Sequence, residues 1–209
     1  AALAYQGLGL LRQQLPVSDR IHAIIDSGGQ TPNLIPQTAS LHINIRSRYA
    51  PTLRALSHRI EDVLHGAALM AGVQADIHWD SSPMTMPVRS NQTLGQRWVL
   101  AQREIGRNPY PAGTISDTLA ASTDFGNISL RLPGIHPLIQ IAPEGTGLHT
   151  AEFAAAAQSP RAEEAALDGA YGLAVVALDF LTDDALAADV QAEFEKAGGA
   201  VQVQTYFDS

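Results

Sequence analysis

The stretch from residue 21 to residue 46, IHAIIDSGGQTPNLIPQTASLHINIR, contains two segments with the character of β-strands. Ile21 to Ile25 form an apolar run, and from Leu41 to Arg46 apolar and polar residues alternate, as in a strand with one buried and one exposed face. Roughly a dozen residues separate the two segments, whereas a simple hairpin needs only about two to five. We therefore predict two strands joined by a long, ordered loop, with Arg46 on the polar face.

The loop GGQTPNLIP, residues 28–36, combines two glycines with two prolines. Glycine adopts backbone angles closed to other residues, while proline fixes φ and biases the residue before it toward extended geometry. We expect the middle of this loop to be stiff, which suits a side chain that must meet a ligand accurately. Asn33 stands there with a carboxamide that can donate and accept hydrogen bonds. Alternatively, Asn33 only satisfies the backbone of its own loop, as asparagine often does in turns.

The sequence around these strands predicts a small α+β domain over residues 1–86. Leucines at roughly helical spacing indicate a first helix over 3–15, and helical periodicity continues from Pro51 to Ala71, with Gly72 placed to end that helix. Val73 to Trp79 has the alternation of a further strand. The order helix, strand, strand, helix, strand is that of a ferredoxin-like βαββαβ sandwich without its first strand.

A second domain is predicted over residues 87–209, because the boundary stretch SSPMTMPVRSN breaks both periodicities. Its expected elements are helices over 92–105, from Ser159 onward and over 183–197, and strands over 138–142 and 201–207. Ser159 and Pro160 suit the start of the clearest helix. Apolar side chains at helical spacing line one stripe of that helix: Ala166, Ala170, Leu173, Ala177 and Phe180.

Composition excludes several classes of function. A net charge of -8, a pI near 5.2 and only 13 dispersed Lys and Arg residues disfavour a nucleic-acid partner or an anionic membrane surface. No apolar run approaches the ~18 residues that span a bilayer, so we expect a soluble, cytoplasmic protein. With no cysteine, the chain has neither disulfides nor thiolate ligands. Because the sequence starts at or inside a helix without an initiator Met, we expect it to be a piece of a longer protein.

Two residues are candidates for chemistry by their position alone. The chain has seven histidines, but their local spacing suggests no metal site. His149 differs from the others because it follows the glycine-rich turn PEGTG directly after an apolar strand, a place where α/β proteins put functional side chains. Asp124, within STDFGN, could be a general base, a carboxylate that orients a metal ligand, or a helix cap. No catalytic triad can be assigned from spacing.

Four motifs occur in order: GGQTPNLIP, the strand that ends Asn44-Ile45-Arg46, STDFGNIS and PEGTGLHTAEF. Together they resemble the zinc-dependent aminoacylase and carboxypeptidase family of amidohydrolases, and most of all its aminobenzoyl-glutamate hydrolases and related peptidases. The resemblance runs from the first helix to about Leu181.

The resemblance implies an α/β metallohydrolase whose catalytic domain is interrupted by a lid that also forms a homodimer. Residues 1–86 would be that lid and residues 87–209 the C-terminal part of the catalytic domain. Asn33 would help hold the scissile carbonyl or a carboxylate of the substrate. Arg46 would pair with the carboxylate of the released amino acid, reaching into the partner's site, as suits a planar guanidinium.

His149 matches the family's last zinc ligand, and the family binds two zinc ions. The remaining ligands and the catalytic glutamate belong to an N-terminal half that this sequence does not contain. A lone imidazole cannot hold a catalytic zinc. The chain alone is therefore expected to be metal-free and inactive, as part of an enzyme that cleaves N-acyl amino acids, aminobenzoyl-glutamate or dipeptides.

Two other interpretations stay open at this point. The chain could be a non-enzymatic module that binds a small carboxylate or dimerises through its sheet edge. It could also be one subunit of a two-chain enzyme whose missing ligands lie on the other subunit.

Overall fold

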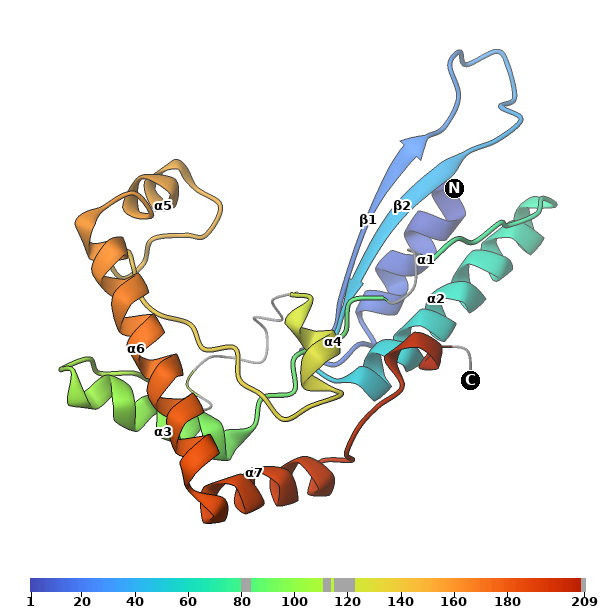
Figure 1. Cartoon of the computed structure of the whole chain (residues 1–209). Helices are drawn as coiled ribbons and strands as arrows, with labels where there is room; N and C mark the ends of the chain where they lie inside the picture. Colours follow the sequence, from blue (N-terminus) through green and yellow to red (C-terminus); the bar gives the residue numbers. More distant parts are fainter. Residues whose placement is uncertain (80–83, 111–113, 115–122, 208–209) are drawn as a thin grey trace. The chain divides into compact units, whose positions relative to one another are not determined.

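Helices and a two-stranded antiparallel sheet make up the described part of this computed structural model, which covers residues 1–79, 84–110, 114 and 123–207 (Figure 1). The fold is thus of mixed α+β class. The chain divides into two units: residues 1–88 with 115–127 and 202–209 form unit 1, and residues 89–114 with 128–201 form unit 2. Each unit is described by itself.

Unit 1 is built on the antiparallel pair of β1 (Arg20–Ser27) and β2 (Ser40–Arg46). Both predicted strands are confirmed. Ile21 lies opposite Ile45, and an irregularity follows Ile25 where the ladder gives way to the long loop. Along β2 half-buried and exposed residues alternate strictly, as the sequence pattern predicted.

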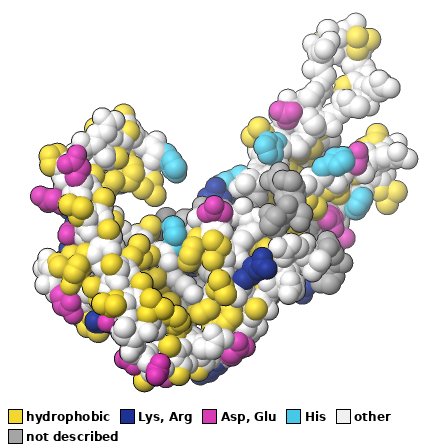
Figure 2. Space-filling view, in the orientation of Figure 1, with side chains coloured by type: hydrophobic (Ala, Val, Ile, Leu, Met, Phe, Trp, Pro, Cys, Tyr) yellow, Lys and Arg dark blue, Asp and Glu magenta, His cyan; other side chains and the backbone are white. Residues whose placement is uncertain are grey.

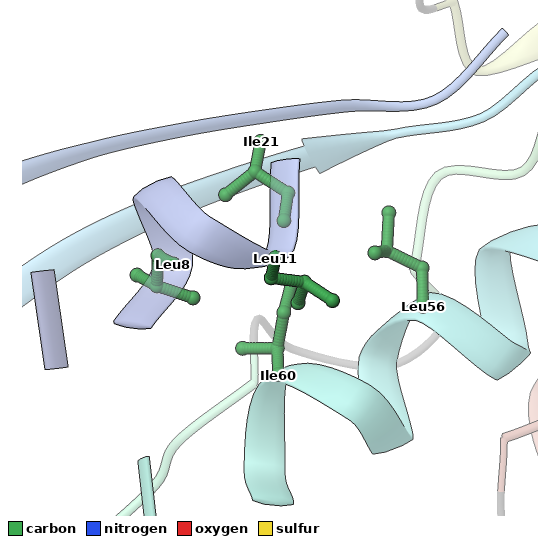
Figure 3. Close-up of a cluster of buried hydrophobic side chains, with 5 residues drawn as sticks. All are labelled: Leu8, Leu11, Ile21, Leu56 and Ile60. Atoms are coloured by element: carbon green, nitrogen blue, oxygen red, sulfur yellow. The ribbon is translucent and has the colours of Figure 1, made fainter. Parts of the chain in front are cut away.

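The core of unit 1 forms where the sheet meets α1 (Ala2–Arg12) and α2 (Ala50–Ala71). Five side chains from these elements meet there (Figure 3): Leu8, Leu11, Ile21, Leu56 and Ile60. Each is less than a tenth exposed, and burial of such a side chain is worth about 1.5–3 kcal/mol. The helices thereby cover one face of the sheet and leave the polar face of β1 and β2 open.

Helix α2 begins and ends where its sequence predicts. Pro51 lies in the first turn, where its missing N–H costs no hydrogen bond. Gly72 ends the helix in the left-handed conformation, with φ of 68°, and its N–H points to the carbonyls of Ala68 and Leu69.

The predicted strand from Val73 to Trp79 is wrong, because this segment has no strand partner among the described residues. It keeps the burial pattern of a strand, since Ala75, Ile77 and Trp79 are half-buried and their neighbours exposed. The Trp79 indole N–H donates to the Glu61 carboxylate of α2 at 2.6 Å. Alternation alone thus placed its side chains but not its backbone hydrogen bonds.

Unit 2 is centred on α3 (Gln92–Glu104), α6 (Pro160–Thr182) and α7 (Asp184–Lys196), which confirms the three predicted helices. Leu94, Trp98, Val176 and Val190 form its core. Gly172 lets α6 approach α3, because a Cβ there would lie 2.4 Å from the Gln102 amide nitrogen. Ser159 caps α6 by accepting a hydrogen bond from the Ala162 N–H, as predicted.

The stripe predicted on α6 does not face the core of unit 2. Its five residues are exposed: Ala166, Ala170, Leu173, Ala177 and Phe180. The buried side carries Ala165, Gly172 and Val176 instead. Two ion pairs with α3 and the residues after it set this orientation, because Asp168 pairs with Arg107 and Asp179 with Arg97.

The predicted strands over 138–142 and 201–207 are also wrong. Residues 138–142 have no strand partner in the described part of the chain, and the tail contains a short 3-10 helix, η1 (Val203–Thr205). Two short helices were not predicted: α4 (Phe125–Ser129) and α5 (Ala151–Ala156). By length and composition α6 could also cross a membrane, so the expectation that no segment is apolar enough needs correction.

The core of unit 1 makes a first testable prediction. Ile60 is fully buried, so Ile60→Ala leaves a cavity and should lower the free energy of unfolding of unit 1 by about 2–5 kcal/mol. Leu69 lies on the same helix but is 83% exposed, so Leu69→Ala should change it by less than about 0.5 kcal/mol. Urea titration followed by circular dichroism measures both. Equal effects of the two substitutions would contradict this packing.

A second prediction concerns Glu193, whose carboxylate accepts hydrogen bonds from the Gln92 and Thr93 amides at the start of α3. Burial raises the pKa of Glu193, but these bonds and one from the Thr93 hydroxyl lower it more, so the pKa lies below its usual value. A depressed pKa stabilises the folded state above the unfolded-state pKa of about 4.3, and this stability is lost as the pH falls further.

Glu193→Gln should therefore make the unfolding free energy of unit 2 less dependent on pH below about 4.3. Glu164→Gln, on the exposed side of α6, should leave the slope unchanged. Urea titrations between neutral and acidic pH measure the slope. A Glu193→Gln variant with the slope of the parent chain would contradict the predicted linkage.

Candidate substrate-binding site

Arg46 ends β2 on the exposed face of the sheet. Its Nε–H donates to the side-chain oxygen of Asn44 at 3.3 Å, two residues earlier on the same face. No other bond to Arg46 is found within the described part of the chain. The two Nη groups thus remain available in a fixed fork, the geometry that binds a carboxylate with two parallel hydrogen bonds.

Arg20, the partner of Arg46 across the ladder, has a different environment. Its Nη1 donates to the carbonyl oxygens of Val17 and Asp19, so its guanidinium is used by the protein itself. The buried Asp19 carboxylate in turn accepts a 2.6 Å hydrogen bond from Ser47, the residue after β2. These bonds fix the end of the hairpin that carries Arg46.

The same sheet face also carries two histidines. His22 lies opposite Asn44 and His42 opposite Ile24, and both imidazoles are exposed. From Arg20 to Ile24 and from His42 to Arg46, this face presents basic and neutral side chains without a carboxylate. Its electrostatic character therefore favours an anionic group.

Asn33 lies in the loop between β1 and β2, where the chain turns with a Leu34 N–H to Thr31 carbonyl bond of 3.4 Å. Gly29 takes a φ of 117°, and a Cβ on it would sit 3.4 Å from the ring of Pro36. The loop is therefore closely packed at its base. The Asn33 side chain is exposed and makes no hydrogen bond within the described residues. This geometry gives no support to the interpretation that it serves its own loop.

One protomer does not bring Asn33 and Arg46 together. The loop joins the strands at one end of the hairpin, and Arg46 ends β2 at the other (Figure 1). β2 has 7 residues, which corresponds to about 20 Å of strand. A small substrate cannot contact both side chains of the same hairpin in this conformation.

Asp124 precedes α4, and its carboxylate accepts a 3.3 Å hydrogen bond from the Thr123 hydroxyl. The interpretation of Asp124 as a helix cap is wrong, because the first helical N–H, of Phe125, points to the Thr123 oxygen instead. Asp124 is exposed. Its role as a base or as an orienting carboxylate stays a prediction, and Ser122 of the same motif lies outside the described residues.

Two other residues of this motif have clear structural roles that the sequence analysis missed. Asn127 accepts from the Met86 N–H at 2.7 Å and donates to the Met84 carbonyl at 2.9 Å. A Cβ at Gly126 would lie 1.7 Å from the Met86 oxygen, so no other residue fits there. The adjacent Gly-Asn pair was the available signal, since glycine often marks a close backbone approach.

His149 belongs to the loop before α5 and has a φ of 61°, which is uncommon for a residue other than glycine. Thr150 orders this loop by donating to the Gly147 carbonyl and by capping α5 at the Phe153 N–H. Such a backbone conformation is often found at functional positions. The His149 side chain is exposed.

A shallow depression of about 360 Å³ lies beside His149 in this loop. Its lining residues come from the turn and the start of α5: Glu144, Gly145, Thr146, Gly147, Thr150 and Glu152. The described residues nevertheless contain no group of three or more histidine and carboxylate side chains that could hold a metal ion. His149 by itself does not fit a catalytic zinc, which needs further ligands.

The chain is similar over most of its length to known hydrolases. It is 34% identical over 195 residues to Xaa-Arg dipeptidase of Mus musculus, a match that covers 93% of this chain and 45% of the dipeptidase. The Homo sapiens Xaa-Arg dipeptidase is 32% identical over 195 residues, with 93% and 44% covered. A p-aminobenzoyl-glutamate hydrolase subunit of Escherichia coli (strain K12) is 23% identical over 241 residues, with 91% and 50% covered.

The chain thus spans about half the length of the curated relatives it matches. No protein-family model matches it.

The contact at Gly126 gives a third prediction. Gly126→Ala should destabilise unit 1 by more than about 2 kcal/mol, because the new Cβ would overlap the backbone of Met86. Gly66 lies inside α2 with open space around it, so Gly66→Ala should stabilise by about 0.5–1 kcal/mol. Urea titration of both variants measures the difference. A neutral Gly126→Ala would rule out the close approach.

Proposed function

Since the chain belongs to the amidohydrolase and peptidase family of Xaa-Arg dipeptidase and p-aminobenzoyl-glutamate hydrolase, we propose that it is the C-terminal part of a metal-dependent enzyme that cleaves amide bonds. The observation that carries this proposal is the 34% identity over 93% of the chain. The proposed substrates are dipeptides, N-acyl amino acids or aminobenzoyl-glutamate.

The names of the relatives share one chemical feature. A dipeptide that ends in arginine and aminobenzoyl-glutamate both carry an amino acid with a free carboxylate beyond the amide bond. Arg46 suits such a group, because Asn44 orients its guanidinium and its Nη groups face solvent on a face without carboxylates. We assign Arg46 to the carboxylate of the amino acid that is released.

The proposed architecture is a lid of ferredoxin-like type over residues 1–86, followed by the C-terminal part of the catalytic domain. Supporting the lid, α1 and α2 cover one face of the β1–β2 ladder, and residues 73–79 run beyond α2 with the burial pattern of a strand. A homodimer through the lid would let Arg46 of one protomer and Asn33 of the other meet one substrate. The distance between them along one hairpin favours this arrangement over a site within one protomer.

The proposed metal site is incomplete in this chain. His149 would supply one ligand of a two-zinc site, and the remaining ligands with the general base would come from the half of the relatives that the chain does not match. The strained backbone of His149 supports a functional position. The chain alone would then be inactive. Location in the cytoplasm stays a prediction.

A non-enzymatic module that binds a small carboxylate, or that only dimerises, is the alternative function. The exposed fork of Arg46 favours it as much as it favours the enzyme. So does the finding that no metal-binding cluster occurs among the described residues. Activity of the intact protein, meaning the complete product of the gene that encodes this chain, separates the two.

The direct test compares hydrolysis of an Xaa-Arg dipeptide, an N-acetyl amino acid and aminobenzoyl-glutamate by the intact protein and by this chain. We expect the intact protein to cleave at least one of them in the presence of zinc and the chain to cleave none. An intact protein that binds these compounds but cleaves none would favour the binding module.

Arg46 provides the fourth prediction. Arg46→Ala in the intact protein should lower kcat/KM by about 10- to 100-fold, the loss of one charge-assisted contact of roughly 1.5–3 kcal/mol. The same substrate with an amidated carboxyl group should be cleaved equally by both forms, because it lacks the anion. Arg12→Ala, at the exposed end of α1, is the control. An equal loss on the amidated substrate would remove Arg46 from carboxylate recognition.

A further inference from the structure

Helix α6 presents a continuous apolar surface away from α3. The outward residues are alanine and leucine through more than three helical turns: Ala166, Leu167, Ala170, Leu173, Ala174, Ala177, Leu178 and Leu181. Leu167, Leu178 and Leu181 are 73%, 61% and 78% exposed. Figure 2 shows hydrophobic side chains gathered over this part of the molecule. Exposed apolar surface of this extent marks a site of contact.

The charges of α6 explain why this surface is unbroken. From Ala165 to Thr182 the helix has only two charged residues, and both pair with arginines of α3 or of the segment after it. Asp168 accepts from Arg107 Nε at 2.5 Å, and Asp179 accepts from Arg97. The Gln102 amide also donates to the Asp168 carbonyl at 2.7 Å. The polar side of α6 is thereby turned inward, and its apolar side has no partner among the described residues of unit 2.

A lipid bilayer is the less suitable occupant. The length and mean hydropathy of α6 would suffice for a membrane span. Spanning would however place the carboxylates of Asp168 and Asp179 and their arginine partners in hydrocarbon, which is costly. The outward face also alternates alanine with leucine, and small side chains let another helix or a sheet approach closely.

We propose that the outward face of α6 is the docking surface for the polypeptide that corresponds to the unmatched half of the relatives. The chain covers only 45% of the mouse dipeptidase, so more than half of that protein is available to cover such a face. This inference rests on the proposed function in one respect, since both require that further polypeptide. It adds the place where the two parts meet.

The absence of cysteine from the chain allows a clean test. Ala170→Cys and Ala177→Cys put a thiol on the outward face with little change in volume, and Ala188→Cys puts one on the exposed surface of α7 as a control. Each variant is made in this chain and in the intact protein, with any other cysteines replaced by serine. The measured quantity is the rate of reaction with a maleimide.

In this chain all three thiols should react at similar rates. In the intact protein the thiols at 170 and 177 should react at least 100-fold more slowly, while the thiol at 188 keeps its rate. Equal rates at all three positions in the intact protein would overturn the proposal. So would a gene that encodes nothing beyond this chain, or protection that requires phosphatidylcholine vesicles, or protection of the chain alone that grows with its concentration.

The readout separates this inference from the proposed enzyme. Protection of 170 and 177 in an intact protein that cleaves no amide would support the docking surface and contradict the hydrolase. Cleavage by an intact protein whose thiols at 170 and 177 react freely would support the hydrolase and contradict the docking surface.

Discussion

Packing of one sheet face against two helices is the constraint on which unit 1 depends. A two-stranded ladder is at best marginally stable in water, so β1 and β2 need the cover that α1 and α2 give them. Ile21 is the strand residue at the centre of that contact, between Leu8 and Leu11 on one helix and Leu56 and Ile60 on the other. Because this packing takes one face, the other stays open, and Arg46 lies on the open face in a defined direction.

Elements with local signals were predictable from the sequence, and elements that need a distant partner were not. The end of α2 at Gly72 and the start of α6 at Ser159 depend on residues within a turn of the boundary. Residues 73–79 and 138–142 have strand-like alternation, but a strand also needs a neighbour to accept its hydrogen bonds. The orientation of α6 failed for a similar reason, because ion pairs with Arg97 and Arg107 decided which face is buried.

The candidate site was predictable to the same limit. Alternation along β2 places Arg46 on the exposed face, but the bond from its Nε to Asn44 and the closure of the hairpin end by Asp19 and Ser47 needed coordinates. The glycine and proline pattern gave a correct expectation of an ordered loop around Asn33. The role of Asp124 as a cap passed to its neighbour, since Ser, Thr and Asp compete for the same helical N–H groups.

The central claim is that the chemistry of this protein is completed by residues outside the chain, with His149 as one contributor. The most direct measurement is zinc content by elemental analysis after dialysis against micromolar zinc, for this chain, the intact protein and the His149→Ala form of each. The account predicts near-stoichiometric zinc in the intact protein, a reduced amount in its His149→Ala form, and none retained by the chain. Tight zinc in the chain alone, lost on His149→Ala, would contradict it.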